Sequence, residues 1–204
     1  MGTRYVEEKS DGEDISTNRF EAALVYALHL HAEQKRKGTT VPYISHLLAV
    51  AALVLEDGGS EDEAIAALLH DAIEDQGGEP IRQEICRRFG DRVIEIVNGC
   101  TDTDETPKPP WLERKKEYLE HLRSAGPEVL RVSAADKLHN ARSILADLRR
   151  QGQAVWGRFN GGREGTLWYY RRLVQIFRDC GPSFLVEELD RVVSELERLA
   201  ATAP

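Results

Sequence analysis

The sequence predicts an all-α protein with a single domain. Apolar residues recur at three- and four-residue spacing along most of the chain, as in helices with one buried face. No segment has the regular alternation of a convincing strand. With 204 residues, the chain is long enough for one well-buried domain and too short for two comfortable ones. We therefore expect one helical domain over residues 18–200, after a flexible acidic segment, residues 1–17.

The expected helices are bounded mostly by glycine, proline or a capping residue. Ser60 and Glu63 have capping-box spacing, so a helix should begin there, and we expect it to continue unbroken to Asp75. Residues 101–110 predict a loop, and the glycine-rich residues 151–165 predict an irregular segment. The helices that the pattern predicts cover, approximately, residues 18–35, 42–57, 60–75, 80–88, 91–99, 111–124, 127–145, 166–180 and 182–199.

Composition and charge restrict the class of protein. Hydrophobic residues make up 41% of the chain and charged residues 30%, the balance of a soluble globular protein. No apolar run approaches the ~20 residues that span a bilayer, and the polar N-terminus does not resemble a signal peptide. We therefore expect a cytoplasmic protein. Its net charge of -8 argues against nucleic acid or an anionic membrane as a partner, although local cations can still bind a small polyanionic substrate.

Three stretches place metal-ligand side chains beside apolar helical runs. They contain His46, the pair His70-Asp71, and Asp136. Adjacent residues on a helix point about 100° apart, so His70 and Asp71 can approach one ion from two sides. His46 and Asp136 would complete the site from other helices. Two imidazoles, two carboxylates and free water positions suit Mn²⁺ or Fe²⁺ better than a closed tetrahedral zinc site.

Two further carboxylates follow this cluster along the chain. Glu74 and Asp75 lie four residues after His70 and Asp71, so each should share a helix face with its partner. A carboxylate beside a metal ion can orient a water molecule and accept its proton. The arrangement is that of a hydrolase.

A structural interpretation competes with this one at each position. A histidine beside an apolar face more often satisfies a structural contact than it binds a metal, and we interpret His29, His31 and His121 in that way. His70 and Asp71 differ, because an unpaired aspartate carried into a buried helix is costly without a cation or a donor.

Six short motifs follow one another over about residues 20–145. They are His31-x-x-Gln34-x-Arg36-Lys37, Pro42-Tyr43-Ile44-x-His46, Leu68-Leu69-His70-Asp71-x-x-Glu74-Asp75, Phe89-Gly90-x-x-Val93, Thr101-Asp102 and Ala135-Asp136-Lys137-Leu138-His139-Asn140. In order and approximate spacing they resemble a known family, the HD hydrolase domain of RelA/SpoT homologues and especially the stand-alone small alarmone hydrolases.

The resemblance implies a fold, an activity and a set of roles. It implies an all-helical HD-domain bundle that uses Mn²⁺ to remove the 3′-pyrophosphate of guanosine tetraphosphate or pentaphosphate. It assigns metal binding to His46, His70, Asp71 and Asp136, and positioning of the attacking water to Glu74 and Asp75. It also places Arg36 and Lys37 near the nucleotide, and Asn140 and Ser143 near its base or ribose. Arg36 offers a planar fork for phosphate or a stacking face, whereas a solvated helix end is the structural alternative.

This chain departs from the family pattern at a few positions. Gln76 replaces the threonine that commonly follows the Glu-Asp pair, and Trp111 stands where some stand-alone members have a lysine. Lys108 is a possible substitute for that lysine. Tyr169 and Tyr170 belong to a tail that matches less well, and the sequence leaves open whether they pack between helices or line the nucleotide pocket.

Three functions remain in competition. The first is hydrolysis of guanosine tetraphosphate, ppGpp, to GDP and pyrophosphate, which Arg36, Lys37 and Asn140 favour. The second is hydrolysis of another nucleotide, such as a deoxynucleotide or a reduced dinucleotide phosphate, which the change at Trp111 keeps open. The third is a non-catalytic module that binds alarmone, and the Glu74-Asp75 pair argues against it. The sequence leaves the oligomeric state open.

Overall fold

The computed structural model describes residues 17–103, 105, 107–181 and 183–201, and it confirms the expected all-α class. Of the expected flexible segment 1–17, only Thr17 lies within these residues. The helices are α1 (Thr17–Leu30), α2 (Ile44–Glu56), α3 (Glu61–Leu69), α4 (Ala72–Gln76), α5 (Glu79–Phe89), α6 (Asp91–Cys100), α7 (Trp111–Leu122), α8 (Pro127–Gln151), the 3₁₀ helix η1 (Gly152–Arg158), α9 (Gly162–Cys180) and α10 (Phe184–Ala201).

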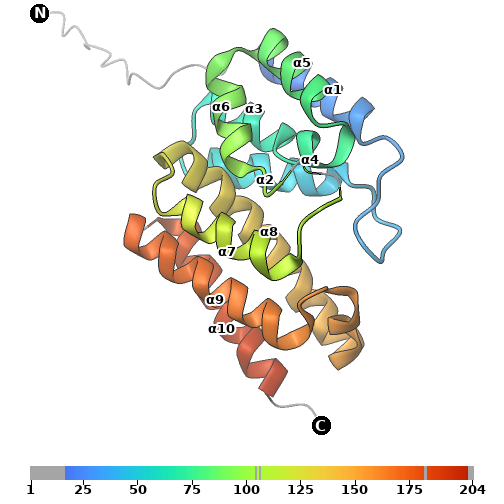
Figure 1. Ribbon diagram of the computed structural model, residues 1–204, viewed down its shortest axis with the longest axis vertical. Coiled ribbons are helices and arrows are strands. Elements are labelled where there is room, and N and C mark those ends of the chain that lie inside the picture. Colours follow the sequence, from blue (N-terminus) through green and yellow to red (C-terminus); the bar gives the residue numbers. More distant parts are fainter. Residues whose placement is uncertain (1–16, 104, 106, 182, 202–204) are drawn as a thin grey trace, which may run out of the picture.

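The long helix α8 joins the two parts of the bundle. Helices α1 to α6 gather in one half of the molecule, α7, α9 and α10 pack together in the other, and α8 runs between them (Figure 1). Helix α8 packs against α2, α3 and α6 in the first group and against α9 and α10 in the second. One continuous apolar core results, and it includes Leu47, Leu68, Leu138 and Leu173, which are fully buried. The side chains of α8 therefore reach the centre of the molecule.

The first helix is shorter than the sequence predicts. It ends at Leu30 rather than near Lys35. Residues 31–43 turn back on themselves instead, because the backbone N–H of Arg36 donates to the carbonyl of Val41 and that of Tyr43 to Gln34. Gly38 permits the turn with a φ of 72°, a conformation that other residues rarely adopt. Lys35 and Pro42 form a single antiparallel bridge, and no strand forms among the described residues.

The third expected helix is interrupted at the residues that carry its chemistry. Ser60 caps α3 through the expected capping box with Glu63, but α3 ends at Leu69 and α4 begins at Ala72. His70 and Asp71 occupy the turn between them. Asp71 has φ -98° and ψ -1°, outside regular helical values. The prediction of one unbroken helix was therefore wrong, since periodicity does not reveal a local change of direction.

The glycine-rich segment is more ordered than expected. Helix α8 extends to Gln151, η1 follows directly, and α9 begins at Gly162, four residues before the predicted start. The glycines provide space rather than disorder. A Cβ atom at Gly161 would lie 2.6 Å from the indole of Trp111, so the ring packs directly against bare backbone. No helix within the described ranges is long and apolar enough to cross a membrane.

Candidate metal centre

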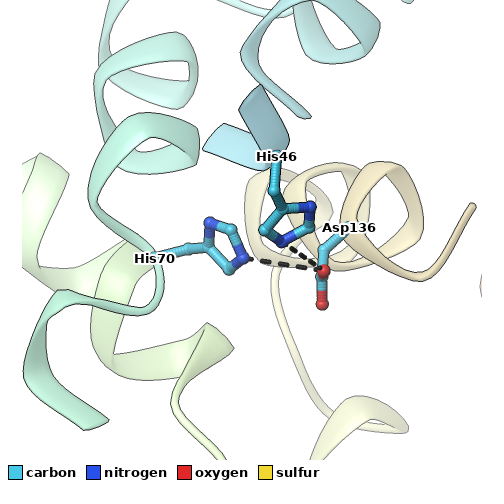
Figure 2. A group of neighbouring side chains, drawn as sticks. All are labelled: His46, His70 and Asp136. Atoms are coloured by element: carbon cyan, nitrogen blue, oxygen red, sulfur yellow. Dashed lines mark ion pairs between the residues drawn. The ribbon is translucent and has the colours of Figure 1, made fainter. Parts of the chain in front are cut away.

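Three buried ligand-type side chains from three different parts of the chain converge at one point. His46 comes from α2, His70 from the end of α3 and Asp136 from α8 (Figure 2). Their exposed fractions are 0%, 2% and 5%. The Nε2 atom of His46 lies 3.2 Å from Oδ1 of Asp136, and Nε2 of His70 lies 3.6 Å from the same oxygen. Each candidate ligand atom of this group is within 4.8 Å of the others.

Asp71 adds a fourth ligand-type group to this cluster. Its Oδ2 atom lies 3.0 Å from Nε2 of His70 and 3.6 Å from Nε2 of His46. The hydroxyl of Tyr43 donates to the same oxygen at 2.6 Å and fixes the orientation of the carboxylate. The four groups that the sequence selected as metal ligands are therefore brought together. The turn between α3 and α4 places Asp71 beside His70.

Hydrogen bonds on the far side of each imidazole fix which nitrogen faces the cluster. The Nδ1 atom of His70 lies 2.8 Å from the carbonyl of Ala67, which can only accept, so Nδ1 carries the proton. In a neutral ring, Nε2 then presents a lone pair to the carboxylates. The Nδ1 atoms of His46 and His139 lie 2.7 Å apart. If His46 donates across that contact, its Nε2 also presents a lone pair.

The electrostatics of the cluster favour a cation. Burial opposes a charged imidazole, yet the carboxylates of Asp71 and Asp136 outweigh it and raise the pKa of His70 well above its usual value. Burial would likewise raise the pKa of Asp136, but Lys137 and the two imidazoles hold that pKa well below its usual range. His70 does the same for Asp71, with help from His46. Both acids are therefore carboxylates at neutral pH.

The residues present fit a divalent metal ion. The Nε2 atoms of His46 and His70 are buried without any hydrogen-bond partner among the described residues, and both face carboxylate oxygens. Four electron-pair donors directed at one another repel unless a cation lies between them. Two carboxylates also balance the charge of a divalent ion. Nitrogen and oxygen ligands in this mixture suit borderline and hard first-row cations.

Removal of the His139 imidazole should weaken metal binding without unfolding the protein. His139 is half-buried and its ring packs 4.8 Å from that of His46, so it orients a ligand. Such supporting contacts typically contribute 10- to 100-fold to metal affinity. We expect His139→Ala to lower Mn²⁺ affinity by about that factor in a calorimetric titration. The matched control is His29→Ala, an exposed histidine of α1, and equal affinity loss in both variants would contradict this role.

A cavity of about 610 Å³ opens above the cluster, a size typical of small-molecule sites. Asp71, Glu74 and Asp136 line its floor. The four residues expected near a nucleotide also line it: Arg36, Lys37, Asn140 and Ser143. On α8 these side chains follow helical spacing from Asp136 through Asn140 and Ser143. The sequence therefore selected a contiguous set of cavity residues.

The two carboxylates Glu74 and Asp75 occupy different surroundings. Glu74 lines the cavity and forms an ion pair with Lys108, with 2.7 Å between Oε1 and Nζ. Asp75 is exposed and accepts a hydrogen bond from the side chain of Gln34 at 2.7 Å. Desolvation raises the pKa of Glu74, and Lys108 opposes this rise. The pKa of Asp75 is also raised, by desolvation of its inner side and by the nearby carboxylate of Asp71. The two residues are adjacent in α4, and adjacent residues of a helix point about 100° apart, so only one of them faces the cavity.

Several side chains at the site were not selected from the sequence. Tyr43 and His139 orient ligands, although both belong to the quoted motifs. Asp102 accepts from Arg114 and from Lys115, and the three line the cavity together. His31, assigned a structural role, is buried and stacks on Tyr43, with 5.3 Å between ring centres. Tyr43, His139, Asp102 and His31 all occupy motif positions, and those positions were the one signal that could have indicated them beforehand.

The aromatic residues of uncertain role lie in one wall of the cavity. Trp111, Tyr169 and Tyr170 line it, and the two tyrosines are also buried within the helix packing. The rings of Trp111 and Tyr169 meet edge to face at 6.4 Å. The tyrosines therefore pack between helices and also line the cavity. Lys108 donates to Glu74, and its substitution for the lysine that Trp111 replaces stays a prediction.

Comparisons with known proteins agree with this site. The HD domain matches residues 23–167 of this chain. The chain is 38% identical over 134 residues to the guanosine-3′,5′-bis(diphosphate) 3′-pyrophosphohydrolase MESH1 of Xenopus tropicalis. This alignment covers 64% of this chain and 70% of that protein. It is 36% identical over 128 residues to the guanosine-3′,5′-bis(diphosphate) 3′-pyrophosphohydrolase of Aquifex aeolicus, covering 60% of this chain but only 17% of that protein.

The fold is also that of a solved relative. A structure described as a metazoan ortholog of SpoT that hydrolyses ppGpp superposes on this chain with a TM-score of 0.72. The match covers 93% of this chain and 98% of the other at 24% identity, and it concerns the fold. The HD domain accounts for the divalent-metal cluster of two histidines and an aspartate. This chain therefore belongs to the HD-domain family of metal-dependent hydrolase domains.

Proposed function

We propose that this protein hydrolyses the 3′-pyrophosphate of guanosine 3′,5′-bis(diphosphate), giving GDP and pyrophosphate. The observation that carries the proposal is the convergence of His46, His70, Asp71 and Asp136, two of which line a cavity large enough for a nucleotide. The enzyme names of its relatives from Xenopus tropicalis and Aquifex aeolicus support the choice of substrate. Cations around the cavity supply the charge that a polyphosphate requires.

His46, His70, Asp71 and Asp136 would hold the ion, which we propose to be Mn²⁺ or Fe²⁺. A divalent cation there supplies Lewis-acid polarisation of phosphate oxygens and lowers the pKa of water. Tyr43 and His139 keep Asp71 and His46 in position through their hydrogen bonds. The metal-binding groups are thus held before substrate arrives.

Carboxylates in and beside the cavity are proposed to accept the proton of the attacking water. Glu74 is proposed to accept a proton from the attacking water. At the same time the water oxygen forms a bond to the phosphorus attached to O3′. The bond between that phosphorus and O3′ breaks, and O3′ takes up a proton to become the hydroxyl of GDP. Asp75 is proposed to assist from outside the cavity wall, where Gln34 holds it. Arg36, Lys37, Asn140 and Ser143 are proposed to contact the nucleotide.

The acid side of the pH–rate profile should depend on Lys108. Glu74 must be ionised to act as a base, so the rate falls as pH falls through its pKa. Burial raises that pKa, and the ammonium of Lys108 opposes the rise. We expect Lys108→Met to move the acid limb of kcat/KM to higher pH, with little change above it. Lys116→Met, an exposed residue of α7, is the control. An unshifted limb in Lys108→Met would contradict this assignment of Glu74.

A nucleotide panel tests the function itself. Purified protein with Mn²⁺ is incubated with guanosine 3′,5′-bis(diphosphate), deoxynucleotides and a reduced dinucleotide phosphate, and pyrophosphate and single phosphate are assayed separately. We expect pyrophosphate from the first substrate alone. Release of single phosphate from another nucleotide would favour the second hydrolase hypothesis, which the indole of Trp111 in the cavity wall supports. Binding without turnover would identify a sensor.

A further inference from the structure

The cations that line the cavity differ in whether a carboxylate neutralises them. Near the metal centre they are paired. Arg114 and Lys115 both donate to Asp102, and Lys137 donates to Asp136. These three cations share two carboxylates, and the further carboxylates Asp71 and Glu74 line the same cavity, so this end has little net positive charge left for a second phosphate group.

Toward the C-terminal end of α8, the cations are not compensated in this way. Lys37 and Arg150 line the cavity and form no ion pair within the part of the chain that the structure describes. The guanidinium of Arg36 donates to the neutral amide of Asn140 rather than to a carboxylate. The chain has a net charge of -8, so acidic side chains outnumber basic ones. Cations that still lack a carboxylate partner in one wall of the cavity are therefore available to an anionic ligand.

Arg158 joins these cations into one group. Its aliphatic stem covers Gly38, where an added Cβ would lie 2.7 Å from Cδ of Arg158, so it packs beside Lys37. Its Nη2 atom donates to Asp147 at 2.6 Å, and its Nε is left without an acceptor among the described residues. Asp147 and Arg150 are three residues apart on α8 and lie on the same face. We call Lys37, Arg150 and Arg158 the distal basic group.

The distal basic group lies well away from the metal centre. Asp136 and Asp147 line the same cavity from the same helix, eleven residues apart. At 1.5 Å per residue, their backbones are separated by about 16 Å along α8. Long arginine and lysine side chains reach back over part of this length. The remaining gap, lined by Asn140 and Ser143, is available to a nucleoside.

We propose that the distal basic group is a subsite for the 5′-phosphate groups of the nucleotide whose 3′-phosphates lie at the metal centre. The inference rests on the proposed function and adds an orientation to it. With Asp147 included, the group has a net charge of two positive units, which complements a diphosphate. Asp147 fixes the guanidinium of Arg158, while Lys37 and Arg150 stay free to close on the ligand.

The test compares two ligands that differ only at the 5′ position. Guanosine 3′,5′-bis(diphosphate) and guanosine 3′-diphosphate are titrated calorimetrically with Mn²⁺ into a Glu74→Gln background, which slows hydrolysis of the ligands during the titration. We expect Lys37→Ala and Arg150→Ala each to weaken binding of the first ligand by about ten- to a hundredfold, the value of one hydrogen bond to a charged group. Binding of the second should not change. Arg158 is left in place, because its stem packs on the loop.

Arg149→Ala is the matched control. Arg149 is the neighbour of Arg150, but it pairs with Glu195 on α10 and does not line the cavity. If Lys37→Ala and Arg150→Ala weaken the binding of both ligands equally, or weaken the binding of neither, the subsite proposal is overturned. The wild-type assay for pyrophosphate is independent of this result. If the wild-type protein releases pyrophosphate but the variants still bind guanosine 3′,5′-bis(diphosphate) as much more tightly than guanosine 3′-diphosphate as the parent does, the proposed function stands and the subsite fails.

Discussion

Replacement of Asp136 by alanine is expected to abolish pyrophosphate release, with a loss of at least about a thousandfold in kcat/KM. Asp136 is 5% exposed, and its Oδ1 atom faces the Nε2 atoms of both His46 and His70. Without this carboxylate, the cluster loses a ligand and half of its negative charge. Mn²⁺ affinity should therefore fall together with activity, measured by calorimetry and by the pyrophosphate assay.

Loss of fold must be separated from loss of metal in this experiment. Asp136 also accepts from Lys137 and Asn140, so the alanine variant leaves half-buried donors without this acceptor. Asp136→Asn keeps the volume and removes the charge, and circular dichroism reports whether the helices persist. Asp147→Asn changes a carboxylate of the same helix that lies away from the metal cluster. A folded Asp136→Asn variant with unchanged Mn²⁺ affinity would remove this residue from the metal site.

Glu74→Gln is expected to lower kcat by about 10²- to 10⁴-fold and to leave metal binding intact. Glu74 lines the cavity, and its carboxylate accepts a hydrogen bond from Lys108. Glutamine keeps the shape and cannot accept the proton. KM should change little, since the residue is proposed to act on water. Single-turnover rates with Mn²⁺ measure the chemical step directly.

The neighbouring carboxylates make this result specific. Glu33→Gln alters an exposed glutamate that does not line the cavity and should keep full activity. Asp75→Asn tests the second member of the pair. Because Asp75 is exposed and bonded to Gln34, we expect a smaller loss of kcat than in Glu74→Gln. Full activity in Glu74→Gln would exclude it as the proton acceptor.

Helix boundaries could be predicted where a residue acts on its own backbone. The Ser60 capping box and the starts of α7 and α8 at Trp111 and Pro127 agree with the sequence. The predictions failed where distant contacts decide the backbone. Residues 31–35 leave the helix for a loop against α8 and η1, where Arg36 reaches Asn140. The turn at Asp71 follows the same principle, because its carboxylate is fixed by Tyr43, 28 residues earlier in the chain.

The sequence by itself determined the all-α class and selected His46, His70, Asp71 and Asp136, because helical periodicity is local and few patterns bring imidazoles and carboxylates onto buried helix faces. Tertiary structure alone decided which oxygen faces which nitrogen, that Glu74 rather than Asp75 lines the cavity, and which cations lack a counter-ion. These features depend on pairs such as His46 and His139, 93 residues apart, whose contact exists only once α2 and α8 are packed together.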